Sequence, residues 1–119
     1  MSLVLLIDDE PQMGSLVGMC LEGDGDRVIQ VGDLAGALIA ARAERPGVVL
    51  LDLSLGEEDG LSIFPVLRNE PALAKVPILA FTVHDSRREE AMARGLDGFV
   101  TKPFETAGLR SLLRSHLEG

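Results

Sequence analysis

The sequence contains no tryptophan and no tyrosine, and four phenylalanines are its only residues with a benzene ring. Aliphatic side chains must therefore form most of any core. Its single cysteine, Cys20, cannot form an internal disulfide, which fits a reducing compartment, and we expect it to be a small buried apolar group. The chain has two histidines, and it lacks the cluster of nitrogen and sulfur ligands that zinc prefers.

Positive charge is also scarce, because eleven Lys and Arg face nineteen Asp and Glu and the net charge at pH 7 is -8. A surface this acidic repels phosphate backbones, so we expect no direct binding to nucleic acid. The apolar run Leu3–Ile7 is too short to cross a bilayer and lacks the basic leader and cleavage site of a signal peptide. We therefore expect a cytoplasmic protein that does not contact a membrane.

The 119 residues suit one domain, which we expect to extend over 1–119, and 46% hydrophobic with 25% charged residues is typical of a soluble globular chain. Apolar runs alternate with stretches of helical spacing. This alternation predicts an α/β fold with a parallel sheet covered on both faces. The expected class is flavodoxin-like and doubly wound, with five helices and five strands in the order 2-1-3-4-5. We expect the strands at 3–7, 27–31, 48–52, 76–81 and 98–101.

Helix boundaries are predicted from capping residues and breakers. Pro65 would break a helix that had already run a full turn, so we expect the third helix to start near Ser62, with Pro65 in its first turn. Ser86 and Glu89 have the spacing of a capping box, which predicts the start of a fourth helix that Gly95 ends. Apolar spacing in the first helix predicts an inner face formed by Met13, Leu16, Val17 and Cys20.

Polar residues follow four of the apolar runs. These residues are Asp8 and Asp9, then Asp52, Thr82 and Lys102. Because the carboxyl ends of parallel strands meet at one edge of a sheet, we expect one cluster there. Two like unit charges about 4 Å apart repel by roughly 4 kcal/mol at an effective dielectric near 20, and one lysine cannot neutralise three carboxylates. The cluster therefore predicts a divalent cation, and its oxygen ligands favour Mg²⁺.

Considered as chemistry, these residues have the parts needed for phosphoryl transfer. Asp52 supplies a carboxylate nucleophile, a metal neutralises phosphoryl charge, and Lys102 and Thr82 hold the transferred oxygens. An isolated aspartate at a strand end is more often a turn residue, and Asp8 and Asp9 also suit the positive start of a helix. The convergence of five such residues on one edge favours the functional interpretation.

A set of short motifs surrounds these residues: Leu6-Ile7-Asp8-Asp9-Glu10, Leu51-Asp52-Leu53, Asp59-Gly60, Thr82 and Lys102-Pro103-Phe104. Together they resemble the receiver domains of response regulators in bacterial two-component signalling. The resemblance extends over the full length of the chain.

This resemblance implies that Asp52 is the phosphoacceptor, which takes a phosphoryl group from the histidine of a sensor kinase or of a phosphotransfer protein. It implies Mg²⁺ as cofactor. Asp9 and Asp52 would bind the ion directly and Asp8 through water, and the backbone carbonyl of Ser54 would be a further ligand. Lys102 would pair with the phosphoryl group.

The same resemblance implies a conformational switch. Thr82 would turn its hydroxyl towards the phosphoryl group, and Phe99 would be the aromatic residue that moves inward with it. Receivers usually carry a cis peptide before the proline that follows the conserved lysine, so Lys102–Pro103 is a candidate.

The chain departs from the common receiver pattern at three positions. Gly56 stands where proline is common, Val83 stands where a small residue is usual, and Phe99 lacks the hydroxyl of the common tyrosine. We expect Gly56 to loosen the loop over the site and Val83 to restrict a phosphodonor. Ser54, Val83 and His84 border the site, and we expect them to tune the rate and lifetime of phosphorylation.

We expect a phosphorylation-activated switch that catalyses only its own phosphorylation and dephosphorylation and is otherwise no enzyme. Phosphorylation would change the surface formed by the strand at 76–81, the helix at 86–94 and the strand at 98–101. The partners would be the sensor histidine kinase or phosphotransfer protein and a downstream protein or output domain. A homodimer could form through the fourth helix, the fifth strand and the fifth helix.

Two alternatives remain open from the residues. One is a receiver-like interaction module that works without phosphorylation. The other is a Mg²⁺-dependent phosphohydrolase with an aspartyl-phosphate intermediate, which needs a general acid. A carboxylate two residues after Asp52 would support it, and Ser54 and Leu55 offer none.

Overall fold

The computed structural model describes residues 2–117, and its centre is a parallel sheet with the strand order β2-β1-β3-β6-β7. This arrangement confirms the predicted order 2-1-3-4-5, because β6 and β7 are the fourth and fifth strands of this sheet. The strands are β1 (Leu3–Ile7), β2 (Arg27–Val31), β3 (Val48–Asp52), β6 (Ile78–Thr82) and β7 (Gly98–Thr101).

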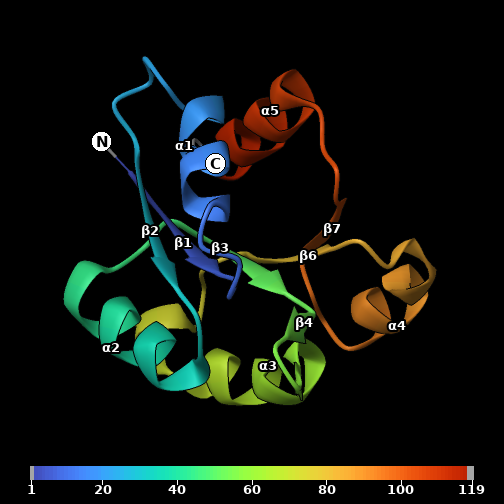
Figure 1. The fold of residues 1–119 in the computed structure, drawn as a ribbon. Helices are drawn as coiled ribbons and strands as arrows, with labels where there is room; N and C mark the ends of the chain where they lie inside the picture. The colour runs from blue at the N-terminus through green and yellow to red at the C-terminus, as the bar shows by residue number, and fades with distance from the viewer. Residues whose placement is uncertain (1, 118–119) are drawn as a thin grey trace.

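Helices cover both faces of the sheet (Figure 1). One face carries α1 (Met13–Cys20) and α5 (Thr106–Leu117), and the other carries α2 (Leu34–Glu44) and α3 (Gly60–Asn69). The short helix α4 (Arg88–Ala93) lies beside β7 at the end of the sheet. This arrangement is the predicted flavodoxin-like fold with five α-helices.

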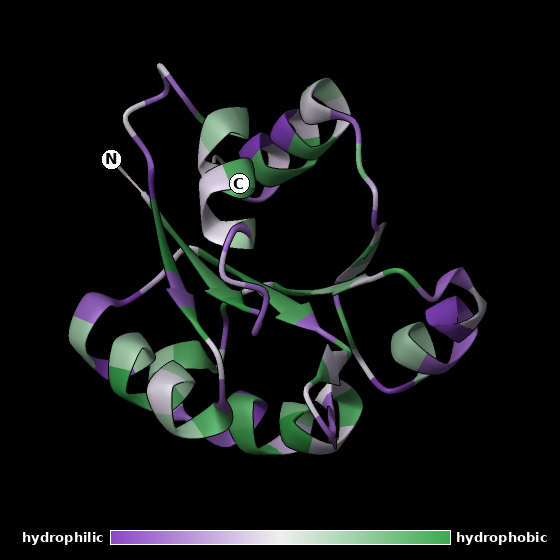
Figure 2. Ribbon diagram, in the orientation of Figure 1, coloured by the Kyte–Doolittle hydropathy of each residue, from purple (hydrophilic) through white to green (hydrophobic). Residues whose placement is uncertain are grey.

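The central strands form the dry middle of the molecule, which Figure 2 shows as hydrophobic strands between partly polar helices. Val4 and Leu6 of β1 pack in the cluster under α1 and α5, whereas Leu5 and Ile7 pack in the cluster over α2 and α3. Alternate side chains of one strand thus enter opposite cores, which explains why β1 and β3 are continuous apolar runs.

A short antiparallel pair follows β3 and was not predicted. It consists of β4 (Ser54–Leu55) and β5 (Glu58–Asp59), with Gly56 between them at φ 58. The pair returns the chain to the end of β3, where the Gly60 amide donates to the carbonyl of Leu53, the residue after β3, at 2.9 Å.

The predicted start of the third helix is wrong. Helix α3 begins at Gly60, and its N-cap is Asp59, whose side chain accepts from the amide of Leu61 at 3.0 Å. Ser62 instead donates its hydroxyl to the carbonyl of Asp59 at 2.6 Å. Pro65 therefore lies inside the helix, where the loss of one backbone donor is offset by burial of the apolar face that starts at Leu61.

The predicted capping box of the fourth helix is also wrong. A 3₁₀ turn, η2 (Asp85–Arg87), precedes α4, and no side chain caps the α-helix. Gly95 does end this segment with left-handed backbone at φ 104, as predicted. A further 3₁₀ turn, η1 (Pro71–Leu73), follows α3.

Leu16 is the exception on the inner face predicted for α1. Met13, Val17 and Cys20 are buried, whereas Leu16 is 43% exposed. The helix has only eight residues, and its buried stripe follows a spacing of three to four without including Leu16. Within residues 2–117, no helix is long and apolar enough to cross a membrane.

Candidate functional site

The carboxyl ends of β1, β3, β6 and β7 bring the predicted cluster together. Carboxylate oxygens of Asp8, Asp9 and Asp52 all lie within 4.8 Å of one another. Asp8, Asp52, Thr82 and Lys102 are buried, and Asp9 is exposed. The three aspartates and Lys102 therefore meet, and Thr82 ends the neighbouring strand, because the parallel strands end at one edge.

Lys102 joins the two buried carboxylates. Its Nζ donates to Oδ2 of Asp8 at 3.0 Å and to Oδ2 of Asp52 at 3.3 Å, and it lies 3.9 Å from Oε1 of Glu10. Burial alone would lower the pKa of Lys102, but the hydrogen bonds and negative charges of Asp8 and Asp52 outweigh burial and raise it. Lys102 is therefore a buried cation at neutral pH.

Asp52 is held by two donors. Its Oδ1 accepts from the amide of Ser54 at 2.9 Å, and its Oδ2 faces Lys102. Burial, with a smaller contribution from the neighbouring charge of Asp8, raises the pKa of Asp52 to about 6, although the hydrogen bond from Ser54 and the charge of Lys102 lower it. The folded state thus disfavours ionisation of the very carboxylate that lies in the centre of the cluster.

The acidic loop after β1 is ordered by its own hydrogen bonds. Asp8 donates its amide to the carbonyl of Val31 at 2.9 Å, and its Oδ1 accepts from the amide of Glu10 at 2.9 Å. Asp9 is exposed at the open side of this loop, with a carboxylate oxygen near those of Asp8 and Asp52. Three carboxylates against one lysine form an oxygen-rich, negatively charged site, which fits a hard divalent cation with direct and water-mediated ligands.

Comparison with known proteins gives the family. Residues 4–114 match the family model described as response regulator receiver domain. The chain belongs to this family. Members of it are phosphorylation-dependent switches of two-component signalling.

Curated relatives of the receiver are transcriptional regulators. It is 39% identical to the probable transcriptional regulatory protein TcrX of Mycobacterium tuberculosis, over 93% of this chain and 49% of that protein. It is 32% identical to the KDP operon transcriptional regulatory protein KdpE of Escherichia coli, over 96% of this chain and 50% of that protein. The receiver thus spans about half the length of these relatives.

Solved structures with the same fold are also receivers. The receiver domain of sensor histidine kinase PA1611 from Pseudomonas aeruginosa, with a magnesium ion coordinated in its active site cleft, aligns with a TM-score of 0.84 and 28% identity, covering 99% of this chain and 98% of that one. The chemotaxis response regulator CheY4 of Vibrio cholerae aligns with a TM-score of 0.85 and 27% identity, covering 98% and 99%.

The two predicted switch residues, Thr82 and Phe99, lie in β6 and β7 of the receiver. Thr82 is fully buried, and its Oγ accepts from the amide of His84 at 3.1 Å. Phe99 is 9% exposed, and the guanidinium carbon of Arg88 lies 4.7 Å from the centre of its ring. The Lys102–Pro103 peptide is cis, as proposed from the sequence.

The three residues predicted to tune phosphorylation are all accessible. Ser54, Val83 and His84 have exposed side chains, and Val83 is 59% exposed. A pocket of about 440 Å³ lies beside Lys102, and Val83 lines it together with Leu16. Val83 therefore stands at the open side of the cluster, where its bulk was predicted to matter.

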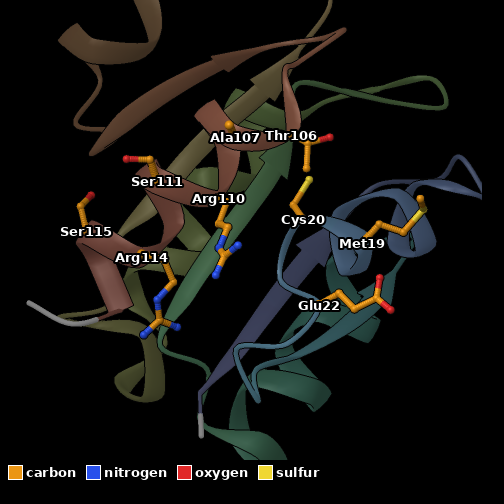
Figure 3. A pocket seen from close by; sticks show the side chains of 9 residues that line it. All are labelled: Met19, Cys20, Glu22, Thr106, Ala107, Arg110, Ser111, Arg114 and Ser115. Atoms are coloured by element: carbon orange, nitrogen blue, oxygen red, sulfur yellow. The ribbon is translucent and has the colours of Figure 1, made fainter.

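Another pocket, of about 700 Å³, lies between α5 and the end of α1 (Figure 3). Cys20 and Glu22 line it on one side, and Thr106 and Arg110 line it on the other. Burial raises the pKa of the Cys20 thiol, more than a hydrogen bond with Thr106 lowers it, so the thiol stays protonated. This pocket contains no member of the strand-end cluster.

Sequence reasoning missed two residues that connect the site to its surroundings. Gln30 of β2 binds the backbone of the acidic loop, and Arg87 of η2 binds Asp59, the N-cap of α3. Gln30 could have been found, because it is a polar residue on the same side of a strand as Val28, which faces the core. Arg87 has no comparable local signal.

Proposed function

We propose that this receiver accepts a phosphoryl group on Asp52 from the histidine of a sensor kinase or a phosphotransfer protein, in a Mg²⁺-dependent reaction. The observation that carries the proposal is the position of the Asp52 carboxylate. It is buried at a strand end, 3.3 Å from the Lys102 ammonium and within 4.8 Å of the Asp8 and Asp9 oxygens. A carboxylate in this position has an ammonium group beside it and neighbouring carboxylate oxygens that could bind the same metal ion.

The reaction forms one bond and breaks one. A carboxylate oxygen of Asp52 attacks phosphorus, the phosphorus–nitrogen bond of the phosphohistidine breaks, and the imidazole nitrogen keeps the electron pair and takes up a proton. The amide of Ser54 orients the carboxylate through Oδ1. Lys102 leaves the Asp52 oxygen and pairs with the incoming phosphoryl group.

The metal site in this proposal uses the residues already described. Asp9 and Asp52 would hold Mg²⁺ directly, Asp8 through water, and the carbonyl of Ser54 would complete the protein ligands. Bound Mg²⁺ would neutralise negative charge on the phosphoryl oxygens. The magnesium ion in the similar receiver domain of PA1611 supports this assignment.

Phosphorylation would then act on the surface of β6, α4 and β7. New negative charge at Asp52 draws the Thr82 hydroxyl away from the amide of His84 and favours an arrangement in which Phe99 packs inward. Helix α4 is suited to such a shift, because Ala91 is its only buried residue in the described chain. The changed surface would bind a downstream protein, an output domain or a second copy of the receiver.

The receiver would catalyse only its own phosphorylation and dephosphorylation. A phosphohydrolase would need a general acid near the nucleophile, and the positions after Asp52 supply the hydroxyl of Ser54 and the buried Leu55. The proposal includes a transcriptional output partner, because TcrX and KdpE are transcriptional regulators about twice as long as this chain. With a net charge of -8, this receiver itself would not contact nucleic acid.

The test is incubation with Mg²⁺ and acetyl phosphate, followed by intact-protein mass spectrometry. The wild type should gain one acid-labile phosphoryl group, Asp52→Asn should gain none, and the control Asp24→Asn, which changes a carboxylate in the turn between α1 and β2, should behave as the wild type. A wild type that gains no phosphoryl group would favour the interaction module. Multiple turnover of an external phosphoester would instead indicate a hydrolase.

A further inference from the structure

Gln30 binds both ends of the short loop that carries Asp9. Its Nε2 donates to the backbone carbonyls of Asp8 and Glu10, each at 2.7 Å, and its Oε1 accepts from the amide of Gly14 at 2.7 Å. Carbonyls can only accept and amides can only donate, so this orientation of the side-chain amide is the one that satisfies all three bonds. One side chain thus joins β2, the acidic loop and the first turn of α1.

We propose that Gln30 is a positioning residue for the metal site, which holds the acidic loop in the geometry that binds Mg²⁺. This inference rests on the proposed function in one respect, namely that Asp9 and its neighbours bind the ion. Gln30 itself touches neither the metal ligand oxygens nor the phosphoacceptor in any bond described above.

The fold directs this side chain towards the loop. Val28 packs in the core under α1 and α5, whereas Ile29 and Val31 pack in the opposite core. Gln30 therefore points to the same side of β2 as Val28, and it pairs in register with Leu6, two residues before the acidic loop. The side-chain amide at this position donates its hydrogen bonds to carbonyls of the loop instead of to water.

The loop needs such support because Asp9, its proposed metal-binding residue, is exposed. Asp9 lies between the two carbonyls that Gln30 bridges, so its backbone cannot rotate without breaking one of these bonds. A carboxylate whose backbone is already ordered loses less conformational entropy when it binds an ion. Residues that orient metal ligands typically contribute about 10- to 100-fold in metal affinity.

Gly14 provides the space for the Gln30 amide. A Cβ at this position would lie 2.7 Å from Oε1 and 3.3 Å from Cβ of Gln30, so an alanine would displace the side-chain amide. Alanine is a better helix former than glycine. A loss of Mg²⁺ affinity in Gly14→Ala would therefore not come from a weaker α1.

The experiment compares Gln30→Met with Gln12→Met, which changes the chain's other glutamine, whose Nε2 binds the side chain of Glu10 and no loop carbonyl. Mg²⁺ affinity is measured by calorimetric titration, and hydrogen exchange of the Gly14 amide is measured by NMR in metal-free protein. Gln30→Met should bind Mg²⁺ about tenfold more weakly or worse and should exchange the Gly14 amide faster. Gln12→Met should match the wild type in both measurements.

Gly14→Ala and Gln30→Met together form a double-mutant cycle. Gly14→Ala should weaken Mg²⁺ binding in the wild type and add nothing in the Gln30→Met background, because both changes remove the same bonds. Two results would overturn the inference about Gln30: unchanged Mg²⁺ affinity in Gln30→Met, or an equal loss of affinity in Gln12→Met. If the wild type still binds Mg²⁺ and is phosphorylated, the proposed function would stand in either case. Absence of Mg²⁺ binding by the wild type overturns both this inference and the metal site of the proposed function.

Discussion

Gly60 lies against the backbone of the proposed phosphoacceptor. A Cβ added there would lie 2.3 Å from the carbonyl oxygen of Asp52 and 2.7 Å from Cα of Leu53. Both are backbone atoms, one at the buried end of β3 and one in the residue that follows it, so neither can move without displacing Asp52. The motif Asp59-Gly60 is thus explained by packing at Gly60 and by helix capping at Asp59.

Substitution of Gly60 should therefore affect both stability and the site. We expect Gly60→Ala to lower the free energy of unfolding by about 1–3 kcal/mol, as overpacking against a core typically does. We also expect slower phosphorylation of Asp52, because its backbone must shift. Denaturant unfolding and the acetyl phosphate assay measure the two effects. Gly108→Ala is the control, since nothing lies within 4 Å of a Cβ at that position.

The raised pKa of Asp52 predicts how stability depends on pH. Burial raises this pKa to about 6 in the folded receiver, so the folded state holds its proton more tightly than the unfolded chain does. In EDTA, the wild type should lose stability relative to Asp52→Asn as the pH rises from about 4 to about 6. At pH 7.5 we expect Asp52→Asn to be more stable by about 1–3 kcal/mol. Thermal unfolding across pH measures the difference, and a difference that does not change with pH would refute the prediction.

At the level of elements, one arginine connects α3 to the segment that starts α4. Both terminal nitrogens of Arg87 donate to Asp59, each at 2.9 Å, and its Nε donates to Glu90 at 3.1 Å. The hydrogen bond from Arg87 lowers the pKa of Asp59 below its ordinary value. The turn before α4 is therefore bound to the end of the loop that follows Asp52.

Removal of this connection should loosen α4. We expect Arg87→Ala to speed hydrogen exchange in α4 and to raise the pKa of Asp59 towards its ordinary value. The stability lost at pH 7 should be about 1 kcal/mol or less, because the pair is partly exposed. The difference from wild type should shrink as the pH falls through the pKa of Asp59 in the folded state, since a lowered carboxyl pKa stabilises only above it.

NMR titration of the Asp59 carboxyl carbon and thermal unfolding against pH measure these effects. Arg94→Ala is the control, because Arg94 pairs with Glu90 at 3.7 Å near the other end of the same helix and lowers the pKa of Asp59 through its charge alone, less than Arg87 does. Equal effects of the two substitutions on Asp59 and α4 would contradict a specific role for Arg87.

For the whole molecule, binding of Mg²⁺ to the carboxylates of Asp8, Asp9 and Asp52 should raise the free energy of unfolding. A ligand that binds only the folded state at ten times its dissociation constant adds about 1.4 kcal/mol to the free energy of unfolding. In a chain of this size, that increment should raise the unfolding midpoint by roughly 4–8 °C. Asp9→Asn should abolish the increase and Asp24→Asn should keep it. Circular dichroism melts at constant ionic strength measure this, and a midpoint that Mg²⁺ leaves unchanged would count against the site.

Much of the fold and of the cluster could be predicted, because both depend on local patterns. Val48 to Leu51 form a short apolar run rich in valine, which predicts a strand covered on both faces, and Asp52 follows directly. Helix boundaries were less predictable. The Ser86–Glu89 spacing matches a capping box, but Arg87 instead binds a residue 28 positions away, and this distant contact accompanies a 3₁₀ turn.

The amino-acid sequence by itself determined the order of the elements, the parallel sheet and the identity of the five polar residues at its edge, because strand periodicity and strand ends are local properties. Only the tertiary structure decided which groups support that edge. Gln30 meets the acidic loop, Arg87 meets Asp59, and Gly60 meets the backbone of β3 through contacts between separate elements. Such contacts depend on how packed elements lie in space, which no local pattern of residues contains.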